Sequence, residues 1–539
     1  MRALGGLIDN APLSLADRHV EQILCQLNNN KRGLPYKTRF SRLLHNDCDD
    51  TEFLATKEEL ICVRGKPLHK NGDPQNAASL LNLYKRKGEN LVQDLCGHFL
   101  IIILHRHSAT LCVLNDKFSS YPLYYTRLDS LLIFCDRFKN MVQAKVSRLE
   151  ANLLSVQDYL QFGKPIQGRT WFHNIQVLKP GESFCYQEGE LRTFTYENYQ
   201  FHETEFKDFN EAHMTFKHLL SNQLKNLSCP LAFMSDAEPD SATQFLYDFS
   251  RRIRDPNHLH LLTPKIEEGK SFFELIQYWL HSADHAFCAP NDFLKPLILQ
   301  KGIDSGYMHF VSAIGGMPLL CLSKQQMPKP KPKRFSWIYG INQAKTAGNP
   351  TTALNHWLDA DVIPHFELLA YENQIQDALI QDEKQFLTAN ALYESDVATL
   401  FTLTESAHVK LQMPYLQEMV LQFSKKMTEK LLYNESAQTH FFENALHDIR
   451  SEASALSQGQ SALTELIASQ PSIQEFFQDL LQTALGRDCL NPEKIKQLRM
   501  DFHHAPRQHL EAAWRLVTLE LYLGELEALG RFKNSPQYA

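Results

Sequence analysis

No stretch of this sequence is apolar for long enough to cross a bilayer. The longest aliphatic run, FLIIIL at 99–104, falls far short of the roughly 20 apolar residues that a membrane helix needs. The opening residues, MRALGGLIDNAPLSL, contain no apolar core of the length that a signal peptide requires. These absences exclude a membrane-spanning class, and we expect a cytoplasmic protein that does not bind membranes.

Closely spaced cysteine pairs and an excess of positive charge are also absent from the sequence. The 11 cysteines include no C-x-x-C pair, which predicts reduced and mostly buried thiols instead of a disulfide framework. The formal net charge of -7 argues against nucleic acid as the main ligand, because phosphate-binding surfaces are usually basic. What remains is an ordinary globular composition, with 43% hydrophobic and 22% charged residues, in a chain long enough for two or three domains.

The hydrophobic pattern changes once along the chain. Short aliphatic runs separated by turn residues predict an antiparallel sheet from about residue 55 to 200, with one helix over 76–88 that ends on Gly88 as its C-cap. After an amphipathic helix at 206–226, buried strands alternate with helices, which predicts a parallel sheet. These strands are PLAFM at 230–234, HLHLLT at 258–263 and YMHFVSA at 307–313. From residue 353 onward the pattern predicts helices.

Several segments resemble, in the same order, those of asparagine synthetases. The segment NDKFSSYPLYYTRLDSLLIFCDRFKNMV at 115–142 is similar to their glutaminase domain, whose Arg-Asp-x-x-Gly-x-x-Pro-Leu-Tyr-Tyr stretch is matched at Asp116 and at 122–125. A serine stands in place of that glycine. Further similar segments are GRTWFHNIQVLKPGESF at 168–184, FVSAIGGM at 310–317, LQMPYLQEMVLQFS at 411–424 and the closing helices at 491–523. Their common order extends the resemblance over nearly the whole chain.

The resemblance implies two domains. Residues 1–205 would form an α+β Ntn-hydrolase-like sandwich, which in that family is a glutamine amidotransferase that releases ammonia from glutamine. Residues 206–530 would form an α/β PP-loop domain of the adenine-nucleotide-hydrolase type, which adenylates a carboxylate and has a helical C-terminal part. Because a fold can persist without its chemistry, the residues of each site decide the function.

The residues that the family uses for glutamine hydrolysis are replaced here. Its nucleophile is a cysteine directly after the initiator Met, whereas Arg2 stands at this position, and a guanidinium cannot attack a carboxamide. Its Asn-Gly-Glu strand end, which stabilises the oxyanion, corresponds to Arg64, Gly65 and Lys66. Its acid that holds the amino group of the substrate corresponds to Asn76. We therefore expect no catalytic residue in this domain, which would be retained for its shape.

The first nucleotide loop has lost its glycines. The family's Ser-Gly-Gly-x-Asp-Ser loop lets backbone N–H groups approach a pyrophosphate, with help from the helix N-terminus that follows. In AFMSDAEPDSATQFL at 232–246, Pro239 removes a donor, and the carboxylates of Asp236, Glu238 and Asp240 would repel a polyphosphate. The same residues are good helix-capping groups, which explains them without a ligand. The more specific alternative is an Mg²⁺ or Ca²⁺ ion bound by the three carboxylates.

The second nucleotide loop is altered as well. Gly315 and Gly316 remain, but Met317 stands where the family has a magnesium-binding aspartate, and a thioether is a poor ligand for that ion. Ionic positions of the family further along the chain are occupied by Lys410, Gln412 and Gln417. The residues that remain as vestiges of the two nucleotide loops are Ser235, Asp236, Asp240, Ser241, Gly315 and Gly316. We expect no bound cofactor. Binding of ATP and magnesium is expected only if the chain is a ligase.

One cluster of candidate metal ligands stands apart from these loops. On a helix, His281 and His285 would share a face, with Asp284 beside them and Cys288 one turn further, and such a set could ligate zinc. The chain contains 23 histidines, so this spacing also arises by coincidence. We expect no metal site there.

Three functions are compatible with these replacements. The first is a pseudoenzyme that binds or regulates a protein or peptide partner, such as an active relative or a pathway enzyme. Its candidate surfaces are the cleft between the two halves and the extended basic loop QQMPKPKPKRF at 325–335. The alternative is an ATP-dependent carbon–nitrogen ligase of the asparagine synthetase, lactam synthetase or peptide cyclase type with a divergent nucleotide loop. A weaker third hypothesis is a changed catalyst that uses the acidic loop with a metal.

Overall fold

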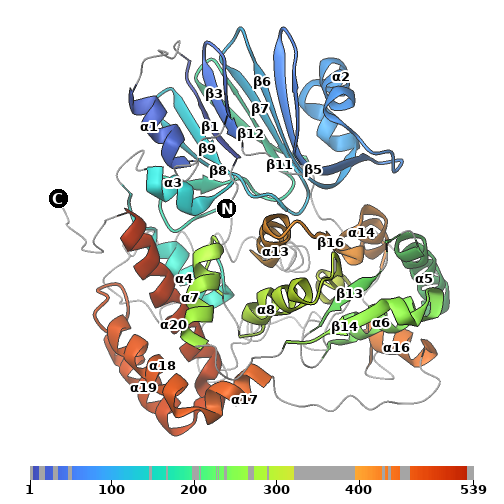
Figure 1. The fold of residues 1–539 in the computed structure, drawn as a ribbon, viewed down its shortest axis with the longest axis vertical. Helices are drawn as coiled ribbons and strands as arrows, with labels where there is room; N and C mark the ends of the chain where they lie inside the picture. The colour runs from blue at the N-terminus through green and yellow to red at the C-terminus, as the bar shows by residue number, and fades with distance from the viewer. Residues whose placement is uncertain are drawn as a thin grey trace, which may run out of the picture.

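The structure is a computed structural model in which strands dominate the N-terminal half and helices the C-terminal half (Figure 1). It describes residues 4–10, 18–27, 34–45, 51–144, 149–165, 168–196, 206, 208–225, 227–228, 230–235, 239–264, 272–287, 290–320, 395–427, 431, 433–434, 439–449 and 462–530. Arg2, Asp236, Glu238, Cys288 and the basic loop at 325–335 lie outside these residues.

Two antiparallel sheets of six strands form the N-terminal half. The strand order of one sheet is β10 (Gln176–Val177), β8 (Tyr124–Leu128), β9 (Leu131–Cys135), β1 (Leu4–Ile8), β3 (Ser41–His45) and β2 (Leu34–Lys37). The strand order of the other is β12 (Glu190–Thr195), β11 (Glu182–Gln187), β7 (Thr110–Asn115), β6 (Leu95–His105), β5 (Glu59–His69) and β4 (Thr51–Ala55).

The alternation of side chains along the strands builds two separate cores. On β6, Leu100 and Ile102 lie in the core between the sheets together with Phe134 of β9. Their neighbours Ile101 and Ile103 point to the opposite face, as a period of two requires, and pack with residues of α2 (Ala77–Lys87) and of the 3-10 helix η1 (Gly88–Asp94). The helices α1 (Arg18–Leu27) and α3 (Phe138–Ala144) cover the outer face of the other sheet. The layers therefore run helix, sheet, sheet, helix, which agrees with the α+β sandwich predicted for residues 1–205.

A parallel sheet organises the second half. Its strand order is β14 (Leu259–Leu262), β13 (Leu231–Met234), β15 (His309–Val311) and β16 (Lys410–Gln412). The predicted strands PLAFM, HLHLLT and YMHFVSA supply β13, β14 and β15, so the parallel arrangement expected from their alternation with helices is confirmed. Because the chain leaves β13 toward β14 on one side and β15 lies on the other, the C-terminal ends of β13 and β15 form the kind of switch point at which such sheets bind ligands.

Helices make up most of the remaining described chain. Around the parallel sheet lie α5 (Phe209–Lys225), α6 (Ser241–Ile253), α8 (Pro290–Asp304), α9 (Gly316–Leu320), α13 (Ser395–Ser406) and α14 (Glu418–Lys425). The other helices are α4 (Leu153–Phe162), α7 (Phe272–Ser282), α16 (Phe441–Ile449), α17 (Ala462–Ser469), α18 (Pro471–Ala484), α19 (Pro492–His504) and α20 (Pro506–Gly530). Short elements complete the chain: η2 (Pro256–His258), η3 (Pro414–Leu416), β17 (Tyr433–Asn434) and β18 (Thr439–His440). Within the described ranges, no helix combines the length and the apolar character needed to cross a membrane.

Both halves share one hydrophobic core, which α20 crosses. This helix packs against α18 and α19 and also against α3 of the first half (Figure 1). The hydroxyl of Tyr159 in α4 lies 2.8 Å from Oγ1 of Thr518 in α20 and donates to the carbonyl of Phe287 at 3.1 Å. Nε1 of Trp514 donates to the same carbonyl at 2.9 Å. The two halves are therefore joined by buried polar contacts as well as by apolar packing.

Candidate functional site

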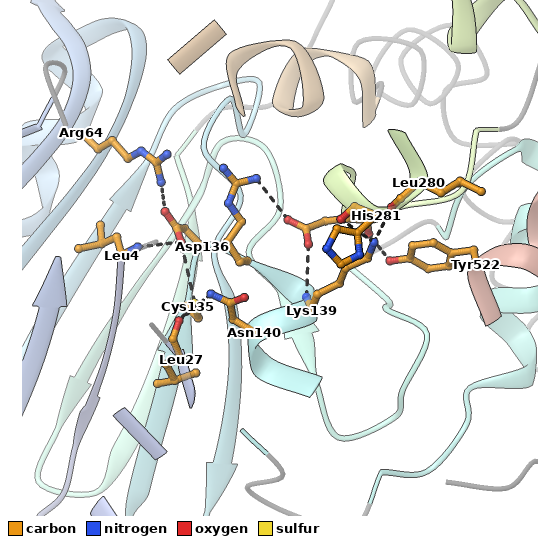
Figure 2. Close-up of polar contacts among 12 residues, drawn as sticks. Leu4, Leu27, Arg64, Cys135, Asp136, Lys139, Asn140, Leu280, His281 and Tyr522 are labelled. Atoms are coloured by element: carbon orange, nitrogen blue, oxygen red, sulfur yellow. Dashed lines mark hydrogen bonds and ion pairs between the residues drawn. The ribbon is translucent and has the colours of Figure 1, made fainter. Parts of the chain in front are cut away.

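A buried ion pair closes the start of the central strand β1. The N–H of Leu4, the first described residue of this strand, donates to Oδ1 of Asp136 at 2.9 Å (Figure 2). Arg64 reaches across from β5 in the facing sheet and forms an ion pair with the same carboxylate. The side chains of Arg64 and Asp136 are only 5% and 0% exposed. The charge of Asp136 is therefore balanced by Arg64, and its carboxylate is hydrogen-bonded to the first described residue of β1.

Residues 64–66 of β5, which correspond to the family's oxyanion-binding strand end, include Arg64 of this pair. Arg64, in the place of the family's Asn, lies with its guanidinium carbon 5.0 Å from the centre of the Tyr121 ring. Gly65 keeps the family's glycine for a steric reason, because its φ is +86° and a Cβ here would come within 2.5 Å of Cε2 of Tyr121. Lys66 is exposed. Of the three positions, only the glycine keeps its residue type.

An aromatic side chain from the second half packs against this strand end. The ring of Phe401 in α13 lies 5.0 Å from His98 and 5.3 Å from Tyr121, measured between ring centres. Nδ1 of His98 is 2.7 Å from Oγ of Ser120, and burial lowers the pKa of this histidine to about 4. The ring is therefore neutral near pH 7. Sequence reasoning missed Phe401, because nothing local marks a contact between residues so distant along the chain.

Asp116, the aspartate of the Arg-Asp pattern, holds a turn. Its carboxylate accepts hydrogen bonds from the backbone N–H groups of Phe99 at 2.9 Å, Phe118 at 2.7 Å and Ser120 at 3.2 Å. Burial raises the pKa of Asp116 to about 6, although these hydrogen bonds lower it. The residue thus keeps a structural task that needs no substrate.

Asn76 is likewise used by the fold. It is the N-cap of α2, where Oδ1 accepts from the N–H of Ser79 at 2.8 Å and its own N–H donates to Oγ of Ser79 at 3.0 Å. This reciprocal pair is a capping box. The helix ends at Gly88, whose N–H donates to the carbonyl of Tyr84, so the predicted C-cap is confirmed.

Lys139 of α3 lies in the seam, the contact region between the two halves (Figure 2). Nζ of Lys139 donates to Oε2 of Glu525 at 2.8 Å and to the carbonyl of His281 at 3.1 Å. Nδ1 of His281 lies 2.7 Å from Oε1 of Glu525. Asp284 accepts from the N–H of Lys139 at 3.3 Å and pairs with Arg137 at 3.6 Å.

The helical face on which the zinc hypothesis depended is absent. The helix α7 ends at Ser282, so His281 and His285 do not share a helix face. Asp284 is held by α3, and Cys288 lies outside the described residues. Among the residues whose placement is described, no three His, Cys, Asp or Glu side chains are grouped as metal ligands.

The segment that resembles the first nucleotide loop ends in a helix cap. Ser235 is buried directly after β13, and its N–H donates to the carbonyl of Leu262 at 2.9 Å. Oδ1 of Asp240 accepts from the N–H of Thr243 at 2.7 Å and caps α6, which confirms the capping role predicted for this residue. Asp240 and Ser241 thus keep the Asp-Ser end of the family's loop, with the aspartate in use as the cap of α6.

The structure brings the second loop against the first. Gly315 has a φ of +87°, and α9 begins at Gly316. Oγ of Ser241 donates to Sδ of Met317 at 3.5 Å. A Cβ at Gly316 would meet the ring of Tyr415 at 2.6 Å, and the Tyr415 hydroxyl donates to the carbonyl of Ala242 at 2.8 Å.

The remaining replaced positions lie on the neighbouring segment. Lys410 is exposed and Gln412 half-buried on β16, and Gln417 is the N-cap of α14 without a side-chain capping bond. Of the residues assigned to the vestigial loops, Ser241 contacts Met317, and Gly316 packs against the ring of Tyr415. Asp236 lies outside the described residues.

The match to a known protein family lies in the N-terminal half of the chain. Residues 53–199 match the glutamine amidotransferase domain family. With the two-sheet sandwich, this match defines the class of the region: a glutamine amidotransferase-like domain. Within that class the chain is similar to asparagine synthetases.

Two curated relatives carry that likeness. The glutamine-hydrolysing asparagine synthetase 1 of Bacillus subtilis (strain 168) is 24% identical over 145 residues, which are 27% of this chain and 22% of that protein. The glutamine-hydrolysing asparagine synthetase 2 of the same organism is 34% identical over 62 residues, which are 12% of this chain and 8% of that protein. The matches thus span about a fifth or less of the length of these relatives.

Solved structures with a partial likeness include the glutamine phosphoribosylpyrophosphate (PRPP) amidotransferase from B. subtilis complexed with ADP and GMP. It shares 9% identity at a TM-score of 0.24, over 59% of this chain and 77% of that chain. A structure of the allosteric regulatory enzyme of purine biosynthesis shares 10% identity at the same TM-score of 0.24, over 59% and 76% of the two chains.

Proposed function

We propose that this chain is an asparagine-synthetase-like protein that has lost glutamine hydrolysis and ATP-dependent ligation and acts as a scaffold or regulatory partner. The observation that carries the proposal is the buried pair of Arg64 and Asp136 at the start of β1. An oxyanion site needs donors aimed at the oxygen that develops charge. The Arg64 guanidinium is committed to a carboxylate instead, and removing one partner of a buried ion pair typically costs about 3–5 kcal/mol.

The neighbouring residues support the same conclusion. Asn76 cannot supply the negative charge that holds an amino group, and its side-chain oxygen is engaged by Ser79. Phe401 packs over His98 and Tyr121 at the strand end. Arg2 replaces the nucleophile itself. Restoring any one of these residues leaves the other defects in place.

The contacts of the second half argue against ATP binding. Met317, which contacts Ser241, offers a thioether in place of a hard oxygen ligand. Tyr415 packs directly on Gly316, so its ring occupies space beside the two loops. Neither phosphate nor magnesium is favoured by this set of side chains.

We further propose that the remaining function is binding to a protein or peptide, such as an active relative or a pathway enzyme. The support is an apolar framework that persists around replaced polar residues: Tyr415, Leu416 and Phe423 are all buried. Affinity purification from the native cell should recover a stoichiometric partner. Recovery of the chain alone, together with a measurable turnover of a small molecule, would contradict this.

The test of lost catalysis combines two assays on the purified chain and on its Arg2→Cys variant. Ammonia release from glutamine should not exceed that of a heat-inactivated sample for either form, because the oxyanion donor and the acid are still missing in the variant. Exchange of pyrophosphate into ATP should be absent with a panel of carboxylic acids. A glutamine-hydrolysing asparagine synthetase assayed in parallel is the positive control, and either activity in the unmodified chain would reject the proposal.

An ATP-dependent amide-bond-forming enzyme is the second candidate, and the sheet topology is the observation that favours it. Ser235 and the Gly315 loop follow β13 and β15, whose C-terminal ends meet at the switch point of the parallel sheet. Pyrophosphate exchange that depends on one carboxylic acid would select this candidate.

A further inference from the structure

Two cysteines face each other on adjacent strands of the sandwich. Cys112 lies on β7 and Cys185 on β11, and the antiparallel register places them directly opposite one another. Their Sγ atoms are 2.9 Å apart. Both side chains lie on the outer face of their sheet, in or against the core that also contains residues of α2 and η1.

The backbone already has the spacing that a disulfide needs. Directly opposite residues of an antiparallel pair have Cα atoms about 4.5 or 5.5 Å apart. Disulfides bridge Cα separations of about 4.4–6.8 Å with a sulfur–sulfur bond of about 2.05 Å. The sulfur atoms therefore need to approach by less than about 1 Å, which small side-chain rotations provide. Cys112 is buried and Cys185 is half-buried, so a reagent reaches the pair through Cys185.

A carboxylate controls the reactivity of the pair. Oε2 of Glu89, in η1, lies 3.1 Å from Sγ of Cys185, and its other oxygen pairs with Arg192. The hydrogen bond with Cys112, burial and the charge of Glu89 all raise the pKa of Cys185. Because the thiolate is the attacking species, these contacts keep Cys185 in its thiol form and slow its oxidation near neutral pH.

We propose that Cys112 and Cys185 form a reversible dithiol–disulfide modification site. The oxidant is the disulfide of a small thiol, such as oxidised glutathione. The Cys185 thiolate attacks one sulfur of the oxidant and releases one small thiol. The Cys112 thiolate then attacks the Cys185 sulfur of this mixed disulfide and releases the second. The two cysteines lose two protons and two electrons in total, and the oxidant is reduced to two thiols.

The modification has a local structural consequence. The S–H group of Cys185 that lies against Glu89 disappears when the bond forms, so η1 loses a contact with β11 while the Arg192 pair remains. We expect faster amide hydrogen exchange over 88–94 in the oxidised chain. The strands β7 and β11, which the new bond crosslinks, should exchange no faster than before.

The test uses the full chain in buffers with graded ratios of reduced to oxidised glutathione. After alkylation of the remaining thiols, peptide mapping by mass spectrometry should find Cys112 linked to Cys185, and an excess of reduced glutathione should reverse the link. Because the unmodified chain is used, the result does not depend on a variant that folds. Cys112 and Cys185 that both remain alkylated as thiols at every ratio overturn the proposal.

Two variants test the mechanism. Glu89→Gln removes the charge beside Cys185, and we expect crosslinking about three- to tenfold faster near pH 7.5, since a larger fraction of the thiol is ionised. Glu190→Gln changes an exposed carboxylate of β12 and should leave the rate unchanged. Equal crosslinking rates for Glu89→Gln and the unmodified chain would show that Glu89 does not govern the reactivity of Cys185.

Discussion

Asp116 is a residue of the amidotransferase pattern that has a structural role in this fold. The carboxylate holds the backbone of Phe99, Phe118 and Ser120, and the side chain of Ser120 contacts His98. Each of these contacts is needed for the turn to fold in a buried position, whether or not glutamine binds. The presence of the aspartate in the sequence is therefore evidence for the fold alone.

The raised pKa of Asp116 predicts a specific pH dependence of stability. Burial raises this pKa from 3.8 to about 6, so between these values the folded chain binds a proton that the unfolded chain has released. The contribution of Asp116 to the free energy of unfolding is thus full below pH 4 and is lost as the pH rises through 6. On lowering the pH from 7 to 4.5, we expect the unmodified chain to gain about 2 kcal/mol relative to Asp116→Asn.

Urea unfolding of both proteins at the two pH values measures this change. The exposed Asp129→Asn is the control for the general effect of removing one carboxylate. A difference between the unmodified chain and Asp116→Asn that stays constant with pH would show that the carboxyl group titrates in its ordinary range.

Sequence reasoning identified several residues of the first site but not their partners. Arg64 and Asn76 were assigned to lost catalytic positions, and both residues are engaged by the fold. The ion pair with Asp136 joins two facing sheets, and Phe401 reaches the strand end from the other half. Such contacts depend on how distant elements pack, which no local spacing records.

Secondary structure followed local patterns where those patterns were strong. The aliphatic run at 99–104 and the apolar runs of the second half do lie in strands, because runs of consecutive apolar residues suit strands that are buried on both faces. The zinc hypothesis required a helix over His281 and His285, and nothing in the local pattern predicted the end of α7. It ends at Ser282, where Asp284 instead accepts from the N–H of Lys139. Tertiary contacts thus override the local helical spacing there.

The capping box of α2 allows a prediction at the scale of one element. Asn76→Ala removes the acceptor for the N–H of Ser79 and should lower the free energy of unfolding by about 1 kcal/mol. Asn76→Asp keeps a good N-cap, so its stability should be close to that of the unmodified chain. This second variant also restores the acid implied by the family.

Urea unfolding and glutamine calorimetry on both variants separate the two roles of this position. We expect no glutamine binding by Asn76→Asp, because Arg64 and Phe401 still occupy the strand end. Glutamine binding gained by this single change would contradict the assignment of the site as structurally closed.

At the scale of the whole molecule, charged contacts in the seam connect the two halves. Lys117 pairs with Glu418 of α14 at 2.9 Å, and Lys139 pairs with Glu525 of α20 at 2.8 Å. The side chains of both lysines are less than a tenth exposed. Because a buried charge requires its partner, these pairs disfavour any state in which one half separates while remaining folded.

The last prediction therefore concerns cooperativity. The unmodified chain should unfold in urea with the same midpoint for the two halves when amide hydrogen exchange is followed along the sequence. Lys139→Met removes the ammonium partner of Glu525, which is half-buried and still contacts His281, and should destabilise the seam by about 1.5–3 kcal/mol. The two halves should then unfold at different urea concentrations. The exposed Lys225→Met of α5 is the matched control and should keep one midpoint.

A double variant distinguishes the lost charge pair from lost packing. In Lys139→Met with Glu525→Leu both charges of the pair are replaced by apolar groups, so much of the stability and the common midpoint should return. If the double variant is as unstable as Lys139→Met, the lysine acts through the carbonyls of Leu280 and His281, to which it also donates. A Lys139→Met chain that still unfolds with one midpoint and unchanged stability would show that apolar packing of α20 alone holds the halves together.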